Sequence, residues 1–169
     1  YSETKTKYAA TTFIDKAIEE NAYRIDRKEN YIGYIAMRPR VEKSGSHGLF
    51  SFSDEHICLS KVAKEVGGHD GVVWTTVISL KREDAERLGY DNMSAWKTLL
   101  QSKSQDLSAA MGIPVTDMKW YAAYHNESGH PHVHLVSYST GKEPYMTRKG
   151  LEKLKAAYAR EIFKNDLYE

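Results

Sequence analysis

The segment from His125 to His134 contains four of the seven histidines in the chain. In a β-strand successive side chains point to opposite faces, so the imidazoles of His132 and His134 leave the same face. A turn at Ser128–Gly129 brings the preceding strand alongside and places His125 next to them. Three convergent neutral imidazoles are typical ligands of a late divalent metal ion such as zinc, copper, iron or nickel. Three protein ligands also leave a coordination position open, as in catalytic rather than structural metal sites.

Two neighbours of these histidines have roles of their own in this interpretation. Glu127 would orient a ligand ring from behind it or act as a general base. His130 is interpreted as a turn residue, with a role as third ligand in place of His125 as the alternative. The competing interpretation is an exposed polar strand face that binds nothing. A terminal affinity tag is excluded, because the cluster is neither contiguous nor terminal.

A pair of tyrosines lies much earlier in the sequence. Tyr31, Tyr34 and Arg38 follow one another at spacings of three and four residues on a predicted helix, so they share one face. A phenol with a pKa of about 10 is a poor nucleophile by itself, but a metal ion that polarises an adjacent phosphate favours attack by its oxygen. Arg38 would stabilise the phenolate or a phosphate oxygen. Without the histidines, packing of two aromatic rings is the simpler explanation.

Length and charge limit the classes of protein to consider. A chain of 169 residues corresponds to one domain. The 24 basic residues are balanced by 23 acidic ones, so a nucleic-acid surface has to be a local patch. Arg38, Arg40 and Lys43 form one candidate patch, and the segment Lys142–Lys164, with seven basic and three acidic residues, forms another. No apolar run is long enough to span a membrane.

The single cysteine and the first residue carry two further expectations. Cys58 has no partner for an internal disulfide, which favours a reducing compartment such as the cytoplasm, and we expect it in the core. The chain begins with Tyr1 rather than methionine. We therefore expect residues 1–169 to be one domain of a longer protein.

The elements that position these side chains follow from hydrophobic periodicity and turn residues. Strands are predicted over Val72–Leu80, Met118–His125 and His132–Tyr138. Helices are predicted over 12–25, Asp26–Arg38, Glu83–Leu88, Ser94–Met111 and 147–163, with a loop over 43–56. This order indicates an α+β domain in which a central antiparallel β-sheet is covered by helices on one face.

The hairpin from His125 to His134 resembles the metal motif of HUH endonucleases. Tyr31–Glu42 and the following stretch His47-Gly-Leu-Phe-Ser are similar to the tyrosine motif of MOBP-type conjugative relaxases of Gram-positive bacteria. The stretches VVWTTVISLKREDA, RLGYDN and WYAAYH resemble the same group, so the likeness extends from Asn30 to the end of the chain. The family pattern has a short strand just before the tyrosine helix, where the apolar spacing predicts a helix over 12–25.

This resemblance implies a reaction. A relaxase nicks one strand of a plasmid or integrative element at its transfer origin, and its tyrosine keeps the 5′ end as a phosphotyrosine that can later be religated. Tyr34 would be the nucleophile, because the family tyrosine begins a Tyr-Ile-Ala-x-Arg stretch, and Tyr31 is the alternative. Glu127 matches an acidic residue of the family's histidine loop.

The resemblance also implies a cofactor and partners. A divalent ion, Mn²⁺ or Mg²⁺ with Zn²⁺ as an alternative, would be held by His125, His132 and His134. Single-stranded DNA at the transfer origin would be the substrate, and accessory relaxosome and coupling proteins would assemble with the chain in the bacterial cytoplasm. The DNA contacts would come from Arg38, Arg40, Lys43 and His47.

Two other functions are compatible with the histidine hairpin. In a three-histidine zinc hydrolase, Glu127 would be the base, Tyr34 would have no role, and a small-molecule pocket would replace the basic cleft. A DNA-binding protein of replication-initiator type would share the hairpin but would not transfer strands. A nicking assay separates it from a relaxase.

Overall fold

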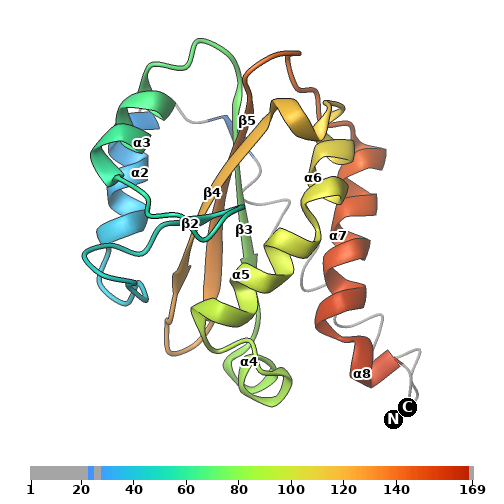
Figure 1. Ribbon diagram of the computed structural model, residues 1–169. Coiled ribbons are helices and arrows are strands. Elements are labelled where there is room, and N and C mark those ends of the chain that lie inside the picture. The colour runs from blue at the N-terminus through green and yellow to red at the C-terminus, as the bar shows by residue number, and fades with distance from the viewer. Residues whose placement is uncertain (1–22, 25–27, 168–169) are drawn as a thin grey trace.

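The computed structural model describes residues 23–24 and 28–167. They form a central sheet with helices packed on it (Figure 1). The strands are β1 (Tyr23–Arg24), β2 (Phe50–Ser51), β3 (Val73–Ser79), β4 (Met118–His125) and β5 (His132–Ser139). The helices are α2 (Lys28–Met37), α3 (Leu59–Gly67), α4 (Arg82–Leu88), α5 (Met93–Ser102), α6 (Ser104–Met111), α7 (Arg148–Ile162) and α8 (Lys164–Leu167), with a 3-10 turn, η1, at Val115–Asp117.

The five strands lie in the order β1-β3-β5-β4-β2, and each neighbouring pair is antiparallel. The predicted α+β class with a central antiparallel sheet is therefore confirmed. β5 occupies the middle of the sheet, with β3 on one side and β4 on the other. The two strands of the histidine hairpin are thus held within the sheet, and β5 is paired on both sides along its length.

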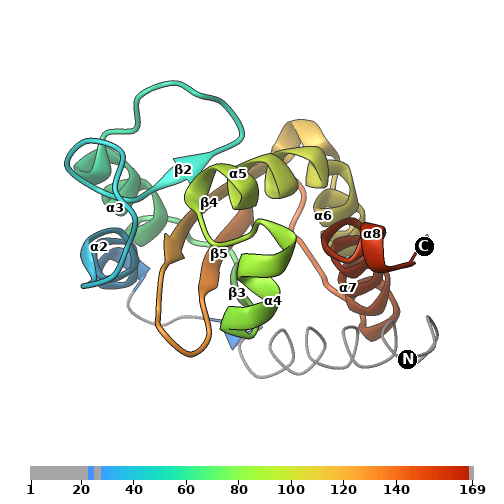
Figure 2. The ribbon, with the colours of Figure 1, turned by 90° about the horizontal axis from the view of Figure 1, so that it is seen from below.

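Helices cover both faces of the sheet, which corrects the prediction of one covered face. Figure 2 shows α2 and α3 on one side of the strands and α5, α6 and α7 on the other. The alternation of side chains along β5 separates two cores. Val133 and Leu135 belong to the core that includes residues of α5 to α7, while Val136 and Tyr138 belong to the core that includes residues of α2 and α3.

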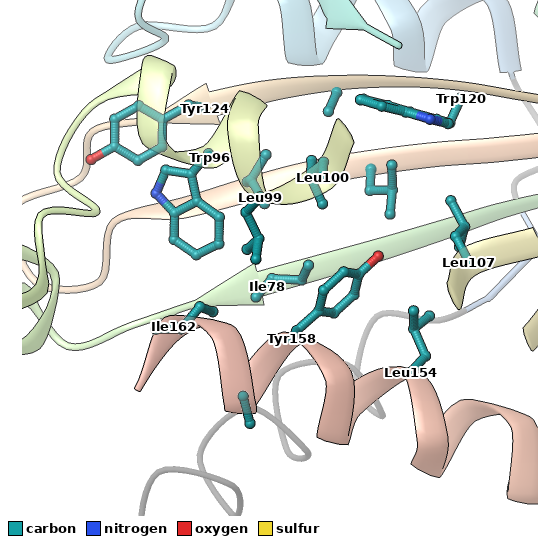
Figure 3. Packing of buried hydrophobic residues seen from close by; sticks show 14 of the residues in the cluster. Ile78, Trp96, Leu99, Leu100, Leu107, Trp120, Tyr124, Leu154, Tyr158 and Ile162 are labelled. Carbon is teal, nitrogen blue, oxygen red and sulfur yellow. The ribbon is translucent and has the colours of Figure 1, made fainter. Parts of the chain in front are cut away.

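The larger core joins the sheet to α5, α6 and α7. Figure 3 shows Trp96 and Leu99 of α5 near the strands, with Tyr158 of α7 beside Ile78 of β3. Leu154, Tyr158 and Ile162 recur every four residues on α7, as the predicted amphipathic stripe requires, and all three are buried. This core anchors the sheet against α5, α6 and α7 and so supports the strands that carry the histidines.

Several elements differ from the predictions at identifiable places. The helix predicted over 94–111 is divided into α5 and α6 at Lys103, while Gly112 ends α6 in the left-handed conformation as expected (φ 68°). Helix α3 was not predicted, although its apolar residues Leu59, Val62, Ala63 and Val66 recur at helical spacing; Val62 and Val66 are buried. Cys58, expected in the core, is exposed at the start of α3.

The N-terminal region follows the family pattern where it can be described. The helix predicted over 12–25 falls mostly outside the described residues, but Tyr23 and Arg24 form the short strand β1, paired with β3. A strand therefore precedes the tyrosine helix, and the helical prediction was wrong at these two positions. Within residues 23–24 and 28–167, no helix combines the length and apolar character needed to cross a membrane.

Candidate active site

Three imidazoles converge on the face of the sheet that α2 and α3 cover. His125 ends β4 and lies directly opposite His132, the first residue of β5, while His134 follows two positions later on the same face. One ring nitrogen from each histidine lies within 4.8 Å of the other two, and the ring centroids are 4.6 to 5.2 Å apart. The structure thus brings together the three histidines singled out in the sequence, and the exposed His130 lies outside the group.

Each of these rings uses one nitrogen for a hydrogen bond directed away from the group. Nε2 of His125 lies 2.8 Å from the carbonyl oxygen of Ile35, and Nδ1 of His132 lies 2.9 Å from that of His130. Because a carbonyl oxygen can only accept, both of these nitrogens carry the proton and the opposite ones carry the lone pair. Nδ1 of His134 is 3.1 Å from the hydroxyl of Tyr31 in α2.

The nitrogens that remain are suited to a ligand. Among the residues that the structure describes, neither Nδ1 of His125 nor Nε2 of His134 has a hydrogen-bond partner, and both atoms are buried. A buried polar atom without a partner is costly, and a bound metal ion would remove that cost. Three imidazoles whose outer nitrogens are held by hydrogen bonds form a donor set that could hold a divalent ion.

Burial keeps the three imidazoles in the neutral form. It lowers the pKa of His125 and of His132, and it lowers the pKa of His134 to about 2. The positive charge of Arg38 lowers the same three pKa values further. The neutral ring is the form that binds metal. The group therefore has its lone pairs available at neutral pH without having to lose protons first.

Helix α2 packs on the same face of the sheet as the histidines, and Ile32 and Ile35 anchor it in the core beneath. Its tyrosines are therefore on the same side of the sheet as the histidine group. The ring of Tyr31 is half-buried and lies edge-on to His134, with 6.2 Å between the ring centroids. Tyr34 is 49% exposed. These two tyrosines, equivalent in the sequence pattern, therefore have different surroundings.

Arg38 links Tyr34 to the histidine group. It donates a hydrogen bond to the hydroxyl of Tyr34, and its guanidinium carbon lies 4.9 Å from the centre of that ring. The same charge acts on all three imidazoles and lowers their pKa values. The Tyr34 oxygen thus lies next to a cation that would stabilise a phenolate.

The other predicted basic residues lie in the loop after α2. Arg40 and Lys43 are exposed. Arg40 has a left-handed backbone (φ 81°), which is unusual for a residue with a side chain, and its carbonyl oxygen accepts a hydrogen bond of 2.8 Å from the Asn126 amide. Next to this contact, an antiparallel β-bridge pairs Val41 with His125. The basic loop is therefore attached to the histidine hairpin.

His47 has different surroundings from those expected of a DNA contact. Its side chain is 6% exposed. Nε2 donates to the Ile57 carbonyl oxygen at 2.8 Å, and Nδ1 accepts from the Leu49 amide at 3.0 Å. Both ring nitrogens are therefore engaged by the backbone, and His47 serves to hold the loop between α2 and α3.

The loop of the hairpin is held by Arg82, a residue of the stretch VVWTTVISLKREDA to which the sequence analysis assigned no role. Arg82, at the start of α4, donates to the Ser128 carbonyl at 3.1 Å, to Oδ1 of Asn126 at 2.7 Å and to the carbonyl of Glu127. The Glu127 carboxylate is close enough to raise the pKa of His125 against the effect of burial. The contact of Arg82 with the hairpin could not be predicted from local spacing, because its partners lie more than 40 positions further along the chain.

The second basic segment lies on the other side of the sheet. The buried face of α7 packs in the core with α5 and α6, opposite the face that carries the histidines (Figure 1). Lys149 and Lys153 are exposed at this helix, as is Arg148 at its first position. The two candidate DNA patches are thus separated by the sheet, and the patch of Arg38, Arg40 and Lys43 is the one next to the histidines.

Comparison with protein families adds a decisive observation. The model of a family described as MobL relaxases matches residues 4–168. The chain belongs to the MobL relaxases. No curated protein and no solved structure gives a significant match. The resemblance to relaxases is confirmed at the level of the family, and the match includes most of the first thirty residues, for which the motifs offered no assignment.

Family membership establishes the general activity. This relaxase is a DNA-nicking enzyme of conjugation or mobilisation, and the family implies binding of single-stranded DNA at a transfer origin. Relaxases use metal ions, and the three-histidine group of this relaxase is compatible with a divalent one.

Proposed function

We propose that this relaxase nicks its transfer origin through attack by Tyr34 on a phosphate next to a divalent ion held by His125, His132 and His134. The observation that carries the proposal is the convergence of three neutral imidazoles, two with buried unpartnered nitrogens among the described residues, beside the helix that bears Tyr34. The sequence resemblance further suggests a MOBP-type relaxase of a Gram-positive element. Its partners would be origin DNA and accessory relaxosome and coupling proteins.

The ligand atoms follow from the hydrogen bonds of the rings. Nδ1 of His125 and Nε2 of His132 lie opposite their donating nitrogens, and Nε2 of His134 lies opposite the one near Tyr31. Bound there, Mn²⁺ or Mg²⁺, or alternatively Zn²⁺, would polarise the scissile phosphate and offset its charge. The negative charge of Glu127 raises the pKa of His125 and of His132, opposing the effect of burial, and would help to orient these ligands. Alternatively, Glu127 would act as a general base.

Two features support Tyr34 as the nucleophile. Its ring is exposed to substrate, and its oxygen accepts a hydrogen bond from Arg38. In contrast, the hydroxyl of Tyr31 lies at Nδ1 of His134, behind the ligand ring rather than in front of it.

The bonds made and broken in this reaction balance. The Tyr34 oxygen bonds to phosphorus and loses its proton, with Arg38 stabilising the phenolate. The bond from phosphorus to the 3′ oxygen breaks, and that oxygen leaves with a proton as a hydroxyl. The 5′ phosphate remains on the tyrosine as an ester, so the reverse reaction rejoins the strand.

The DNA strand should follow the basic loop beside the histidines. We expect the double variant Arg40→Ala/Lys43→Ala to bind single-stranded DNA more weakly and with a smaller salt dependence, by about 0.7 in the logarithmic slope for each phosphate that the protein no longer neutralises. The matched control, Lys149→Ala/Lys153→Ala on α7, should bind as the unaltered chain does. Fluorescence anisotropy across a salt series measures both. Equal weakening by the α7 variant would contradict this path.

The proposed reaction is tested directly with an oligonucleotide. The unaltered chain is incubated with single-stranded DNA that spans the transfer origin, with Mn²⁺ or with a chelator, and the products are separated on a denaturing gel. We expect one cut at one position, dependent on the ion. The fragment on the 3′ side of the cut should migrate with the protein, attached through its 5′ phosphate, and the fragment on the 5′ side should be released with a free 3′ hydroxyl. The absence of cleavage with Mn²⁺, Mg²⁺ and Zn²⁺ would refute the proposal.

A further inference from the structure

Helix α2 is joined to the histidine group by two hydrogen bonds on either side of Tyr34. The Ile35 carbonyl accepts from Nε2 of His125 at 2.8 Å, and the Tyr31 hydroxyl lies 3.1 Å from Nδ1 of His134. Tyr31 precedes Tyr34 by three residues and Ile35 follows it by one. The turn of helix that carries Tyr34 is therefore fastened to two histidines on two different strands.

The contact of Tyr31 falls on a specific nitrogen of its histidine. Nε2 of His134 is the buried atom that lacks a partner among the described residues, and the Tyr31 hydroxyl meets the opposite nitrogen, Nδ1. A metal ligand needs its lone pair on the metal side, so Nδ1 must carry the proton and donate it to the Tyr31 oxygen. In the other tautomer, Nε2 would carry the proton and could not bind metal.

Burial gives this hydrogen bond its effect. His134 is 9% exposed, so solvent has little access to replace the Tyr31 oxygen. Removing the oxygen would leave the Nδ1–H group of the ligand tautomer buried without its partner, which disfavours that tautomer. It would also release one of the two attachments of α2.

We propose that Tyr31 is a positioning residue of this relaxase. Its hydroxyl selects the metal-binding tautomer of His134 and, with the Ile35 carbonyl, fixes the place of Tyr34 relative to the metal centre. This inference rests on the proposed function, because it assigns to His134 the role of a ligand and to Tyr34 that of the nucleophile. It gives the second tyrosine of the motif a task other than attack or aromatic packing.

The test compares Tyr31→Phe with the unaltered chain and with Tyr121→Phe. Tyr121 is also half-buried, lies four residues before His125 on β4, and has a hydroxyl that interacts with Tyr138 and Glu65. Calorimetric titration with Mn²⁺ should show an affinity about 10–100-fold lower for Tyr31→Phe, the usual effect of losing a group that orients a metal ligand. The affinity of Tyr121→Phe should be unchanged.

Nicking kinetics at saturating Mn²⁺ provide the second readout. Tyr31→Phe should still form the covalent adduct at Tyr34, with a lower kcat and an unchanged KM for DNA, because the attacking helix is less well placed. An unchanged Mn²⁺ affinity would overturn the positioning role. An adduct of the unaltered chain that maps to Tyr31 would overturn it too, because it would identify Tyr31 as the nucleophile.

Measurements on the unaltered chain distinguish failure of the Tyr31 positioning role from failure of the proposed nicking reaction. If it binds no Mn²⁺, the metal centre is wrong and the role of Tyr31 falls with it. If it binds Mn²⁺ but cuts no origin DNA, the proposed reaction is wrong, while the affinities of the two variants still decide whether Tyr31 orients His134.

Discussion

Replacement of Tyr34 by phenylalanine should abolish cleavage of single-stranded origin DNA together with the covalent protein–DNA adduct. The change removes one oxygen from an exposed ring and leaves the ring beneath Arg38 in place. Folding and Mn²⁺ affinity should therefore be retained, while loss of a nucleophile lowers the rate by a factor on the order of 10⁴ or more. A denaturing gel measures the cut and the adduct together.

The control and the position of the adduct make this result specific. Tyr145→Phe alters another exposed tyrosine, located between β5 and α7, and should leave cleavage unchanged. Mass spectrometry of the trapped adduct should locate the DNA on Tyr34. An adduct on Tyr31 would show that the choice between the tyrosines is wrong while the chemistry holds. Cleavage by Tyr34→Phe without any adduct would make water the nucleophile and favour the three-histidine hydrolase.

Removal of His134 is expected to have the largest effect on metal binding. Its Nε2 is a buried atom without a partner among the described residues, and the low exposure of the side chain gives solvent little access to supply a replacement ligand. Loss of a group that only orients a ligand lowers metal affinity by about 10–100-fold. We expect His134→Ala, which removes a ligand itself, to lower the affinity for Mn²⁺ and Zn²⁺ by more than that. Calorimetric titration measures the change.

His130→Ala is the matched control for this experiment. His130 is exposed, and its backbone carbonyl rather than its ring holds His132, so the alanine variant retains that hydrogen bond. Its metal affinity should equal that of the unaltered chain. Equal affinities for the His134→Ala variant and the unaltered chain would refute the three-histidine centre.

The histidine group could be predicted because its geometry is local in the sequence. Residues two apart on a strand share a face, and a short turn places the preceding strand alongside. His125, His132 and His134 therefore converge on the basis of the hairpin alone. The groups that orient these rings are different. The carbonyls of Ile35 and His130 are backbone atoms, present at every residue, and no residue type reveals which of them will accept a hydrogen bond.

The two tyrosines show the same limit. Tyr31 and Tyr34 are three residues apart on one helix, and the helical period places both on one face. Their difference arises from tertiary surroundings, namely His134 for the first and exposure beside Arg38 for the second. His47 belongs to a motif in the sequence, but its ring is saturated by two backbone groups that only the folded loop supplies.

The number of covered faces could have been inferred from the strands. β3 has apolar residues on both of its faces, because Val73 and Val77 alternate with Trp74 and Ile78, and β5 has Val133 and Leu135 on one face with Val136 and Tyr138 on the other. Such strands are typical of sheets buried on both sides. The prediction of one covered face left out α3, although its apolar residues recur at helical spacing and would have indicated a second covering helix.

The sequence separations within the site have a consequence for the order of assembly. The three histidines lie on one hairpin, whereas the hydrogen bonds that attach α2 to it span 90 and 103 positions. Interactions between close neighbours form early in folding, and interactions over long loops form late, because the chain entropy lost on closure must be compensated first. A partly folded chain can thus possess the hairpin before its tyrosines arrive. On this basis the ability to cut DNA would be acquired late in folding, when α2 packs against the hairpin.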